Sequence, residues 1–184
     1  MSISQLQEFF DCCVGSWTTE RTYHYLTHQE VERSRTEFII KPLNPGAKLK
    51  VLLDNQRPPH PQIEMLPGYE LAFNTVSEKG DKVSQQLNML FVPHQLDAPV
   101  LEGDYLRDRA YEEAKPMVAH FRYDPATKEL LMTTRYTRAT SVDSITLINP
   151  NLRIRKILNY QPVPEGQPLT NVLLVGFGVE QKKV

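Results

Sequence analysis

Two arginines, Arg153 and Arg155, are separated by a single residue near the end of the chain. On a β-strand, alternate side chains share a face, so these two guanidinium groups would point the same way. Adjacent like charges repel each other unless they meet anions, and a planar guanidinium binds a carboxylate through two parallel hydrogen bonds. The pair therefore indicates either a solvated outer face or a site for a ligand that carries carboxylates, and the spacing alone leaves both open.

A second group of candidates lies in the segment 17–26. Arg21 and Tyr23 would share one face of a strand with Trp17, and His24 would lie on the other face. Arg21 would either pack over Trp17 or line a cavity. Together with Asp143, His24 is a candidate acid, base or hydrogen-bonding group, although a single Asp or His in a strand is also commonly satisfied locally or exposed.

The usual signatures of covalent and metal catalysis are missing from the sequence. It contains no Gly-x-Ser-x-Gly elbow, phosphate loop, dinucleotide fingerprint or His-Glu-x-x-His motif. Cys12 and Cys13 are adjacent, and without other cysteines they cannot form a disulfide framework. We interpret them as ordinary helix residues, and no metal site is predicted because His24 and His28 have no third ligand nearby.

The elements that must position these groups follow from the hydrophobic pattern. Ile3, Leu6, Phe10 and Cys13 recur at spacings of three and four, which predicts a short amphipathic helix at the start of the chain. From residue 16 the period changes to two, with many β-branched and aromatic residues, which is typical of strands. Turn signals containing Pro, Gly, Asn or Asp separate most of these strands. The predicted strands are 17–26, 35–41, 49–53, 69–76, 82–92, 117–123, 130–137, 142–148, 152–160 and 171–179.

About ten strands without crossover helices favour an all-β sandwich or barrel over a parallel sheet. Residues 106–114 are an exception, because their composition favours helix, although a strand followed by a loop fits equally well. The helix followed by Gly15 and Trp17 resembles the start of lipocalin-like barrels. We therefore expect one domain over residues 1–184, a single antiparallel β-barrel of the lipocalin or calycin type with a short N-terminal α-helix.

Composition restricts the partners and the location. The 184-residue chain has a formal net charge of −1, so no strongly basic face is implied and nucleic acid is not an expected partner. No apolar stretch approaches the roughly 20 residues that a membrane helix needs. The N-terminus lacks the basic patch and long apolar run of a secretion signal, so we expect an intracellular protein without a membrane span.

Several short motifs follow one another along most of the chain. They are Phe9-Phe10, Gly15-x-Trp17, Arg21-Thr22-x-His24, Leu106-Arg107-Asp108-Arg109-Ala110-Tyr111, Leu130-Leu131-Met132-Thr133-Thr134-x-Tyr136 and Pro150-Asn151-Leu152-Arg153-Ile154-Arg155. This ordered set resembles the S-type phycobiliprotein lyases, the CpcS/CpeS group. The sequence departs from many members before the Pro-Asn motif, where Asp143-Ser144-Ile145-Thr146-Leu147 stands in place of Glu-Arg-Ile-Trp-Phe, and so it resembles a divergent subgroup.

The resemblance implies a fold and an activity. The fold is a barrel like that of lipocalins or fatty-acid-binding proteins. The activity is that of a bilin lyase, an enzyme that binds a linear tetrapyrrole such as phycocyanobilin and promotes its thioether attachment to a cysteine of a phycobiliprotein subunit. The bilin would be a substrate, and no further cofactor is implied.

Family residues implicated in bilin binding or transfer match Arg21, His24, Arg153 and Arg155, and an acidic family residue matches Asp143. Our hypothesis is that the arginines bind the bilin propionates, that Tyr23 belongs to the same ligand site, and that Asp143 or His24 supplies the catalytic proton or hydrogen bond.

Other functions remain open. The chain would otherwise be a non-catalytic carrier of a bilin or fatty acid, or a partner subunit of a two-component lyase. The resemblance implies a phycobiliprotein subunit as client, a homodimer or a heterodimer with a related subunit, a role in phycobilisome assembly for photosynthesis, and a location in the cyanobacterial cytoplasm or the plastid stroma.

Overall fold

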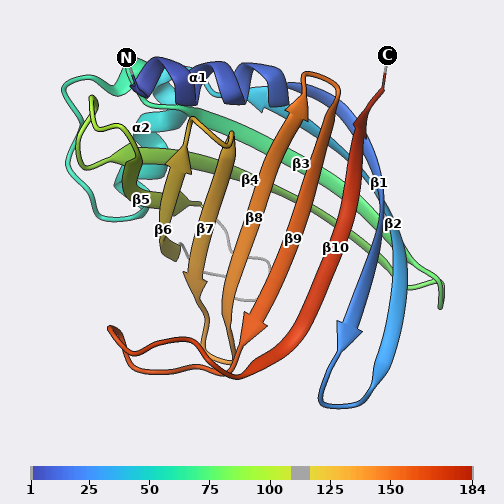
Figure 1. The fold of residues 1–184 in the computed structure, drawn as a ribbon. Coiled ribbons are helices and arrows are strands. Elements are labelled where there is room, and N and C mark those ends of the chain that lie inside the picture. Colours follow the sequence, from blue (N-terminus) through green and yellow to red (C-terminus); the bar gives the residue numbers. More distant parts are fainter. Residues whose placement is uncertain (1, 109–116, 184) are drawn as a thin grey trace.

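A closed antiparallel barrel of ten strands forms the body of the protein, in a computed structural model that describes residues 2–108 and 117–183 (Figure 1). The ring order is β1-β10-β9-β8-β7-β6-β5-β4-β3-β2, so every strand pairs with its sequence neighbours and β1 closes the ring against β10. This confirms the predicted fold class. The strands are Gly15–Tyr25 (β1), Glu30–Pro42 (β2), Gly68–Ser77 (β3), Lys82–Pro93 (β4), Leu101–Arg107 (β5), Met117–Asp124 (β6), Glu129–Arg135 (β7), Thr140–Asn149 (β8), Leu152–Tyr160 (β9) and Val172–Lys182 (β10).

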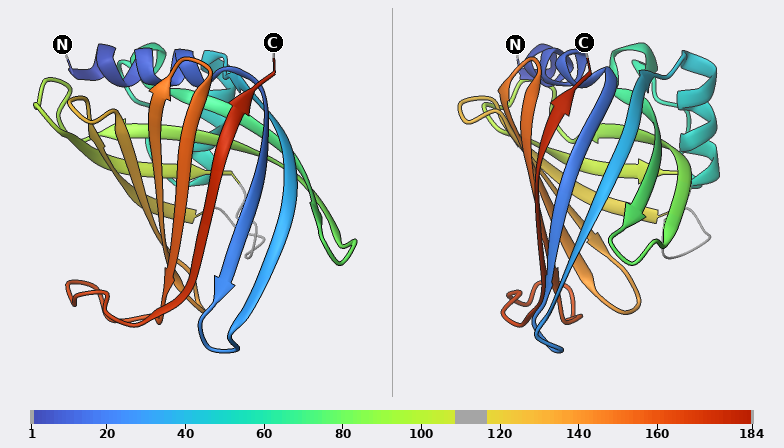
Figure 2. Two further views of the ribbon diagram at one scale, coloured as in Figure 1. Left: turned by 45° about the vertical axis from the view of Figure 1, so that its right-hand side comes forward. Right: turned by 90° about the vertical axis from the view of Figure 1, so that its right-hand side faces the viewer.

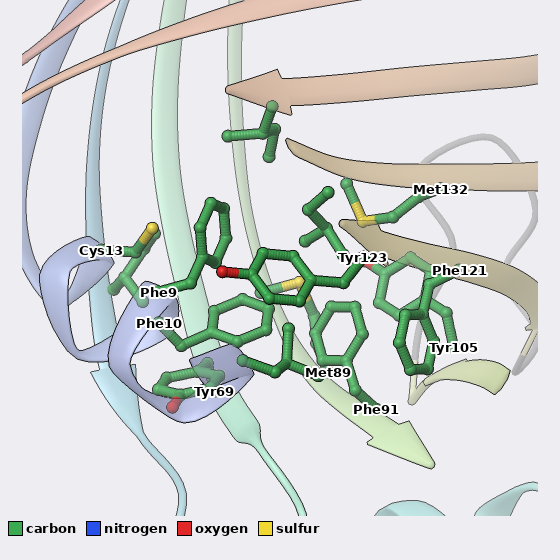
Figure 3. Close-up of a cluster of buried hydrophobic side chains, with 14 of the residues drawn as sticks. Phe9, Phe10, Cys13, Tyr69, Met89, Phe91, Tyr105, Phe121, Tyr123 and Met132 are labelled. Atoms are coloured by element: carbon green, nitrogen blue, oxygen red, sulfur yellow. The ribbon is translucent and has the colours of Figure 1, made fainter. Parts of the chain in front are cut away.

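The N-terminal helix α1 (Ser2–Cys13) lies across one end of the barrel (Figures 1 and 2). Its apolar stripe includes Leu6, Phe9 and Phe10, all buried in the main core. Figure 3 shows Phe9 and Phe10 meeting rings from the strands beneath, and Phe10 stacks on Tyr69 with ring centroids 4.6 Å apart. This helix therefore closes one end of the barrel with aromatic packing.

The turn from α1 into β1 fixes the start of the barrel wall. Gly15 has a φ of +126°, a conformation that residues with a Cβ rarely adopt. The turn places the fully buried Trp17 beneath the helix, where its indole N–H donates to the Cys13 carbonyl at 2.8 Å. That carbonyl is one of those that the end of a helix leaves without an intrahelical partner. Gly15 therefore permits the tight entry into β1, and Trp17 fills the closed end of the barrel.

The predicted strand 49–53 is wrong, because this segment lies in helix α2 (Pro45–Asp54), which packs on the outside of the barrel (Figure 2). Asn44 accepts a hydrogen bond from the Ala47 N–H through its side chain, and Pro45 occupies the first turn, two features that favour a helix start. Buried α2 side chains contact Leu90 of β4 and Leu106 of β5. A short 3₁₀ helix, η1 (Ile63–Met65), follows.

The sequence pattern also missed β5. Leu106 and Arg107 end this strand, which agrees with the strand-and-loop alternative for 106–114 and not with a helix at these two residues, while 109–116 lie outside the described part of the chain. Along β5 the inner face carries Tyr105 and Arg107, and the outer face carries Leu106 under α2. Both faces are covered, so the alternation that marks a half-exposed strand is weak here. Among the described residues, no helix combines the length and apolar character required to cross a membrane.

Candidate functional site

The barrel interior contains a cavity of about 420 Å³, lined by side chains from α1 and from strands β1–β5 and β7–β10. Its size falls within the range of roughly 300–1,000 Å³ seen for small-ligand sites. Towards α1 the wall is apolar and includes Phe10, Phe91, Leu130 and Met132. Figure 3 shows this part of the wall, where Phe91 and Tyr105 stack at 4.9 Å. Such a surface suits a flat, conjugated ligand.

Arg153 and Arg155 both point into this cavity, which decides between the two orientations that the sequence left open. β9 is in register with β8 and β10, and the barrel curvature places its alternate residues 153, 155, 157 and 159 on the inner face. Arg21 and Tyr23 line the same cavity from β1. The structure therefore brings together all four residues predicted to bind the ligand.

A buried carboxylate that the sequence analysis did not identify, Glu180 on β10, joins two of these arginines. It has 0% exposure and accepts from Arg21 Nη2 at 3.0 Å and from Arg153 Nε at 2.5 Å. Burial opposes ionisation of Glu180, but the two guanidinium groups outweigh it and lower its pKa. Glu180 is therefore a buried anion that holds both arginines in place.

Arg153 packs against aromatic rings of the core, a structural role that its sequence pattern did not indicate. Its guanidinium carbon lies 4.9 Å from the ring centre of Trp17 and 5.1 Å from that of Phe38, and the residue is 4% exposed. Cation–π contacts of this kind stabilise a desolvated guanidinium. Arg153 therefore forms part of the cavity floor, where it orients Glu180 and contributes positive charge.

Two glycines on β10 make room for the β1 side chains. A Cβ added at Gly176 would lie 2.8 Å from Tyr23 Cδ1, and one added at Gly178 would lie 2.9 Å from Arg21 Cγ. These residues are directly paired across the β1–β10 ladder. The missing side chains therefore let Tyr23 and Arg21 lie against β10, which brings Arg21 within reach of Glu180.

Asp143 and Arg155 form a second ion pair in the cavity wall, across the paired strands β8 and β9. Arg155 Nη2 lies 3.3 Å from Asp143 Oδ1, and both side chains retain partial exposure, 23% and 21%. Burial would lower the pKa of Arg155, but the carboxylates of Asp143 and Glu180 raise it above its usual value. Asp143 is therefore accessible from the cavity and held in place by a permanent cation.

A fourth arginine, Arg107 on β5, also lines the cavity. Its Nη2 donates to Tyr136 Oη at 2.9 Å, and its guanidinium carbon lies 5.2 Å from the centre of the Tyr105 ring. Burial raises the pKa of Tyr105 to about 12, so this phenol is neutral at physiological pH. The interior thus holds four guanidinium groups and two ion-paired carboxylates, while Glu32 and Asp81 line the cavity closer to the hairpins of its open end.

His24 does not belong to this site. Its side chain is exposed on the outer face of β1, whereas the adjacent residues Tyr23 and Tyr25 line the cavity. A one-residue step along a strand reverses the face, so the local geometry gives His24 no route to a ligand inside the barrel. This placement argues against the predicted acid or base role of His24.

The cysteines lie at the closed end of the barrel, where the Cys13 side chain contacts Arg153. Cys13 is buried with 0% exposure, and burial raises the pKa of its thiol, which keeps it protonated. Cys12 is partly exposed at the end of α1. Neither thiol lines the cavity, which agrees with their interpretation as helix residues.

Glu180 and Arg107 were missed for different reasons. Gly176, Gly178 and Glu180 share the inner face of β10. A single Glu that follows two glycines on one face of a strand was the pattern that could have indicated Glu180. Arg107 was placed in a segment whose composition resembles a helix. The alternation of Gly103, Tyr105 and Arg107 on one face could have indicated a strand that carries Arg107 inwards.

Comparison with known proteins finds relatives across almost the whole chain. The model of a family described as CpeS-like protein matches residues 5–183. A Synechococcus sp. (strain JA-3-3Ab) protein named chromophore lyase CpcS/CpeS 1 is 59% identical over 181 residues, which cover 98% of each chain. A chromophore lyase CpcS/CpeS of Thermosynechococcus vestitus is 25% identical over 154 residues, covering 82% of this chain and 81% of the relative.

A solved structure shows the same fold. The S-type phycobiliprotein lyase CPES from Guillardia theta matches with a TM-score of 0.77 at 18% sequence identity, covering 100% of this chain and 94% of that one. The ten-stranded barrel and its capping helix are therefore shared by a much more distant sequence.

Proposed function

The chain belongs to the CpeS-like protein family, and we propose that it is a chromophore lyase that binds a bilin inside its barrel and promotes its thioether attachment to a cysteine of a phycobiliprotein subunit. The observation that carries the proposal is the inward-facing group of arginines in an accessible cavity, in a chain 59% identical to a protein named as a chromophore lyase. The resemblance found in the sequence is confirmed at the level of the family.

Charge complementarity supports a bilin as the ligand. In the inner part of the cavity, four guanidinium groups have only Glu180 and Asp143 as ion-paired carboxylates, while Glu32 and Asp81 lie closer to the hairpins, so positive charge is concentrated in the inner part. A bilin carries two propionates and a conjugated ring system. The propionates fit the guanidinium groups through charge-assisted hydrogen bonds, and the rings fit the aromatic wall near Phe91 and Tyr105.

The proposed reaction needs no nucleophile from this protein. The client cysteine adds its S–H across the ethylidene double bond of the first bilin ring. The sulfur bonds to the ethylidene carbon and the proton goes to the tetrapyrrole, so no oxidant or reductant is consumed. The protein contributes orientation, because a fixed bilin presents one face of its ethylidene to the incoming thiol.

Asp143 is the proposed catalytic group. A carboxylate held by Arg155 at 3.3 Å can accept a hydrogen bond from a pyrrole N–H and stabilise positive charge as it develops on the conjugated system. A positively charged tetrapyrrole is a stronger electrophile, so this contact accelerates thiol addition. His24, on the outer face, has no part in this step.

The proposal also covers partners and location. The macromolecular partner is a phycobiliprotein subunit, and the bilin is a substrate without a further cofactor. Assembly as a homodimer, or with a related lyase subunit, belongs to the same proposal. Such clients place the protein in the cyanobacterial cytoplasm or in a plastid stroma.

A two-stage assay tests this function. Purified protein is first mixed with phycocyanobilin, and the visible absorption spectrum is recorded; a bound bilin changes its spectrum because the cavity fixes its conformation. An apo-phycobiliprotein subunit is then added, and the product is denatured in acidic urea. A lyase yields an adduct that stays on the client after denaturation and forms faster than in a reaction without the lyase.

The controls separate the alternatives. A client whose bilin-attachment cysteine is replaced by serine should give no adduct. A spectral shift without accelerated attachment would identify a carrier, and the absence of any shift would reject bilin binding by this chain. Either result would contradict the proposed function.

A further inference from the structure

Arg107 differs from the other arginines of the cavity in its electrostatic partners. Arg21 and Arg153 share Glu180, and Arg155 pairs with Asp143. Within residues 2–108 and 117–183, no carboxylate lies within ion-pair distance of Arg107. Asp143 acts on Arg107 only at longer range, because its ion pair is with Arg155.

Among the described residues, the side-chain contacts of Arg107 are with neutral groups. Its Nη2 donates to Tyr136 Oη at 2.9 Å and lies 3.5 Å from Thr134 Oγ1, and its guanidinium carbon is 5.2 Å and 5.6 Å from the ring centres of Tyr105 and Tyr136. Its Nε is buried and has no hydrogen-bond partner. Arg21 and Arg155 also retain an unpartnered Nε, but each of them faces a carboxylate.

A buried cation with only neutral partners is costly, since burial removes hydration that hydroxyl groups and rings replace only in part. Arg107 is 7% exposed and still lines the cavity. An anion in the cavity would restore the missing charge partner. The local chemistry at Arg107 therefore favours a ligand carboxylate, which a guanidinium fork binds through two hydrogen bonds.

Arg107 also comes from a strand that is distant, in the ring of strands, from those of the other arginines. In the ring of strands, β5 is separated from β9 by β8, β7 and β6, and from β1 by β2, β3 and β4. Figure 1 shows β5 and β9 on separate parts of the barrel. The Arg107 side chain reaches from β5 to Thr134 and Tyr136, so a ligand that meets both Arg107 and Arg155 must carry one anionic group towards each.

We propose that Arg107 is a second carboxylate anchor, which binds one propionate of the bilin while the other propionate meets Arg155 and Arg21. This inference rests on the proposed function and deepens it, because it assigns the ligand class as a dicarboxylate whose two anionic groups meet different arginines. The two anchors fix the ligand against rotation within the barrel, which sets the position of the reactive ring.

The test compares Arg107→Gln and Arg107→Lys with the unmodified protein, using phycocyanobilin and its dimethyl ester in absorption titrations. The ester keeps the rings but removes both anionic groups. Arg107→Gln should weaken binding of the free acid about 10- to 100-fold, while affinity for the ester stays within about threefold. Arg107→Lys keeps the charge and should recover part of the loss.

Arg35→Gln is the matched control, since Arg35 lies on the outer face of β2 and is exposed; affinity for both ligands should be unchanged. Circular dichroism and thermal melting establish that each variant is folded. Equal losses for the acid and the ester, or no recovery with lysine, would show that Arg107 only supports Tyr105 and Tyr136, and would overturn the inference.

The outcome for the anchor can be separated from that for the function. If the unmodified protein binds phycocyanobilin and attaches it to a client, but Arg107→Gln binds the free acid equally well, the function stands and the anchor is rejected. If the unmodified protein produces no spectral shift, the proposed function fails and the anchor fails with it.

Discussion

Replacing Glu180 with glutamine should strongly destabilise the barrel. The carboxylate has no exposure and is shared by Arg21 and Arg153, whose side chains lie at 3.0 Å and 2.5 Å. Glutamine keeps the size and one acceptor oxygen but removes the charge. Two buried or nearly buried guanidinium groups would then lose their counter-ion, and Arg153, packed against Trp17 and Phe38 with 4% exposure, has little access to water.

Breaking a buried ion pair by removing one partner costs about 3–5 kcal/mol, and the retained acceptor places this substitution near the lower end. With a urea m-value of about 2 kcal/mol/M, a loss of that size lowers the unfolding midpoint by about 1.5 M. Equilibrium urea unfolding monitored by Trp17 fluorescence is a suitable assay, because the chain has a single tryptophan and it lies beside the cluster.

Glu37→Gln is the matched control. Glu37 also pairs with a cation, Lys183 at 2.9 Å, but both side chains are exposed. Its midpoint should be unchanged, because exposed pairs contribute little. If Glu180→Gln unfolds at the same urea concentration as Glu37→Gln, the view that Glu180 is the structural counter-ion of the arginine wall is refuted.

Three further predictions concern pH, ligand binding and packing. The guanidinium groups lower the pKa of Glu180 in the folded state, because their effect outweighs that of burial. The stability that this cluster contributes should therefore be complete above the unfolded-state pKa of about 4.3 and be lost as pH falls through the lower folded-state pKa. In urea unfolding at about pH 6 and about pH 3, Glu180→Gln should lack this part of the pH dependence of the unfolding free energy. Arg155→Gln should weaken phycocyanobilin binding about 10- to 100-fold in absorption titrations, whereas His24→Ala, on the outer face, should bind normally. Gly176→Ala should destabilise the fold by about 1–3 kcal/mol in urea unfolding, because the added Cβ would meet Tyr23 Cδ1 at 2.8 Å.

Each of these predictions has an outcome that contradicts it. A Glu180→Gln protein that retains the full acid dependence would place the titrating group elsewhere. Bilin binding that survives Arg155→Gln but is lost in His24→Ala would locate the ligand outside the barrel. A Gly176→Ala protein of unchanged stability would mean that the Tyr23 ring moves without cost, and the close packing of β1 on β10 would then not depend on this glycine.

The barrel could be predicted from the sequence because its strands are long and their alternation is regular. The face of Arg153 and Arg155 could not, since an inward and an outward register fit the same alternation, and only the pairing of β9 with its neighbours decides between them. Helix α2 was mistaken for a strand because the short segment 49–53, apolar except for Lys50, fits both structures, and the signal of Asn44 and Pro45 was interpreted as a turn.

The electrostatic organisation of the site was beyond sequence reasoning for a different reason. Arg21 and Glu180 are 159 residues apart, and their contact depends on closure of β1 against β10. Local patterns carry no information on such a pairing. The motif resemblance pointed to Arg21, Arg153 and Arg155 as ligand-binding candidates, but the counter-ion of Arg21 and Arg153, and the inward face of Arg107, appear only in the folded ring.

The crystal structure of the complex with phycocyanobilin is the most direct test of bilin binding inside the barrel. We expect the tetrapyrrole in the interior cavity, with its rings along the aromatic wall, one propionate within hydrogen-bond distance of Arg155 or Arg21, and Asp143 facing a pyrrole nitrogen. A tetrapyrrole bound on the outer surface beside His24, with the interior arginines still facing only each other and their two carboxylates, would contradict the account.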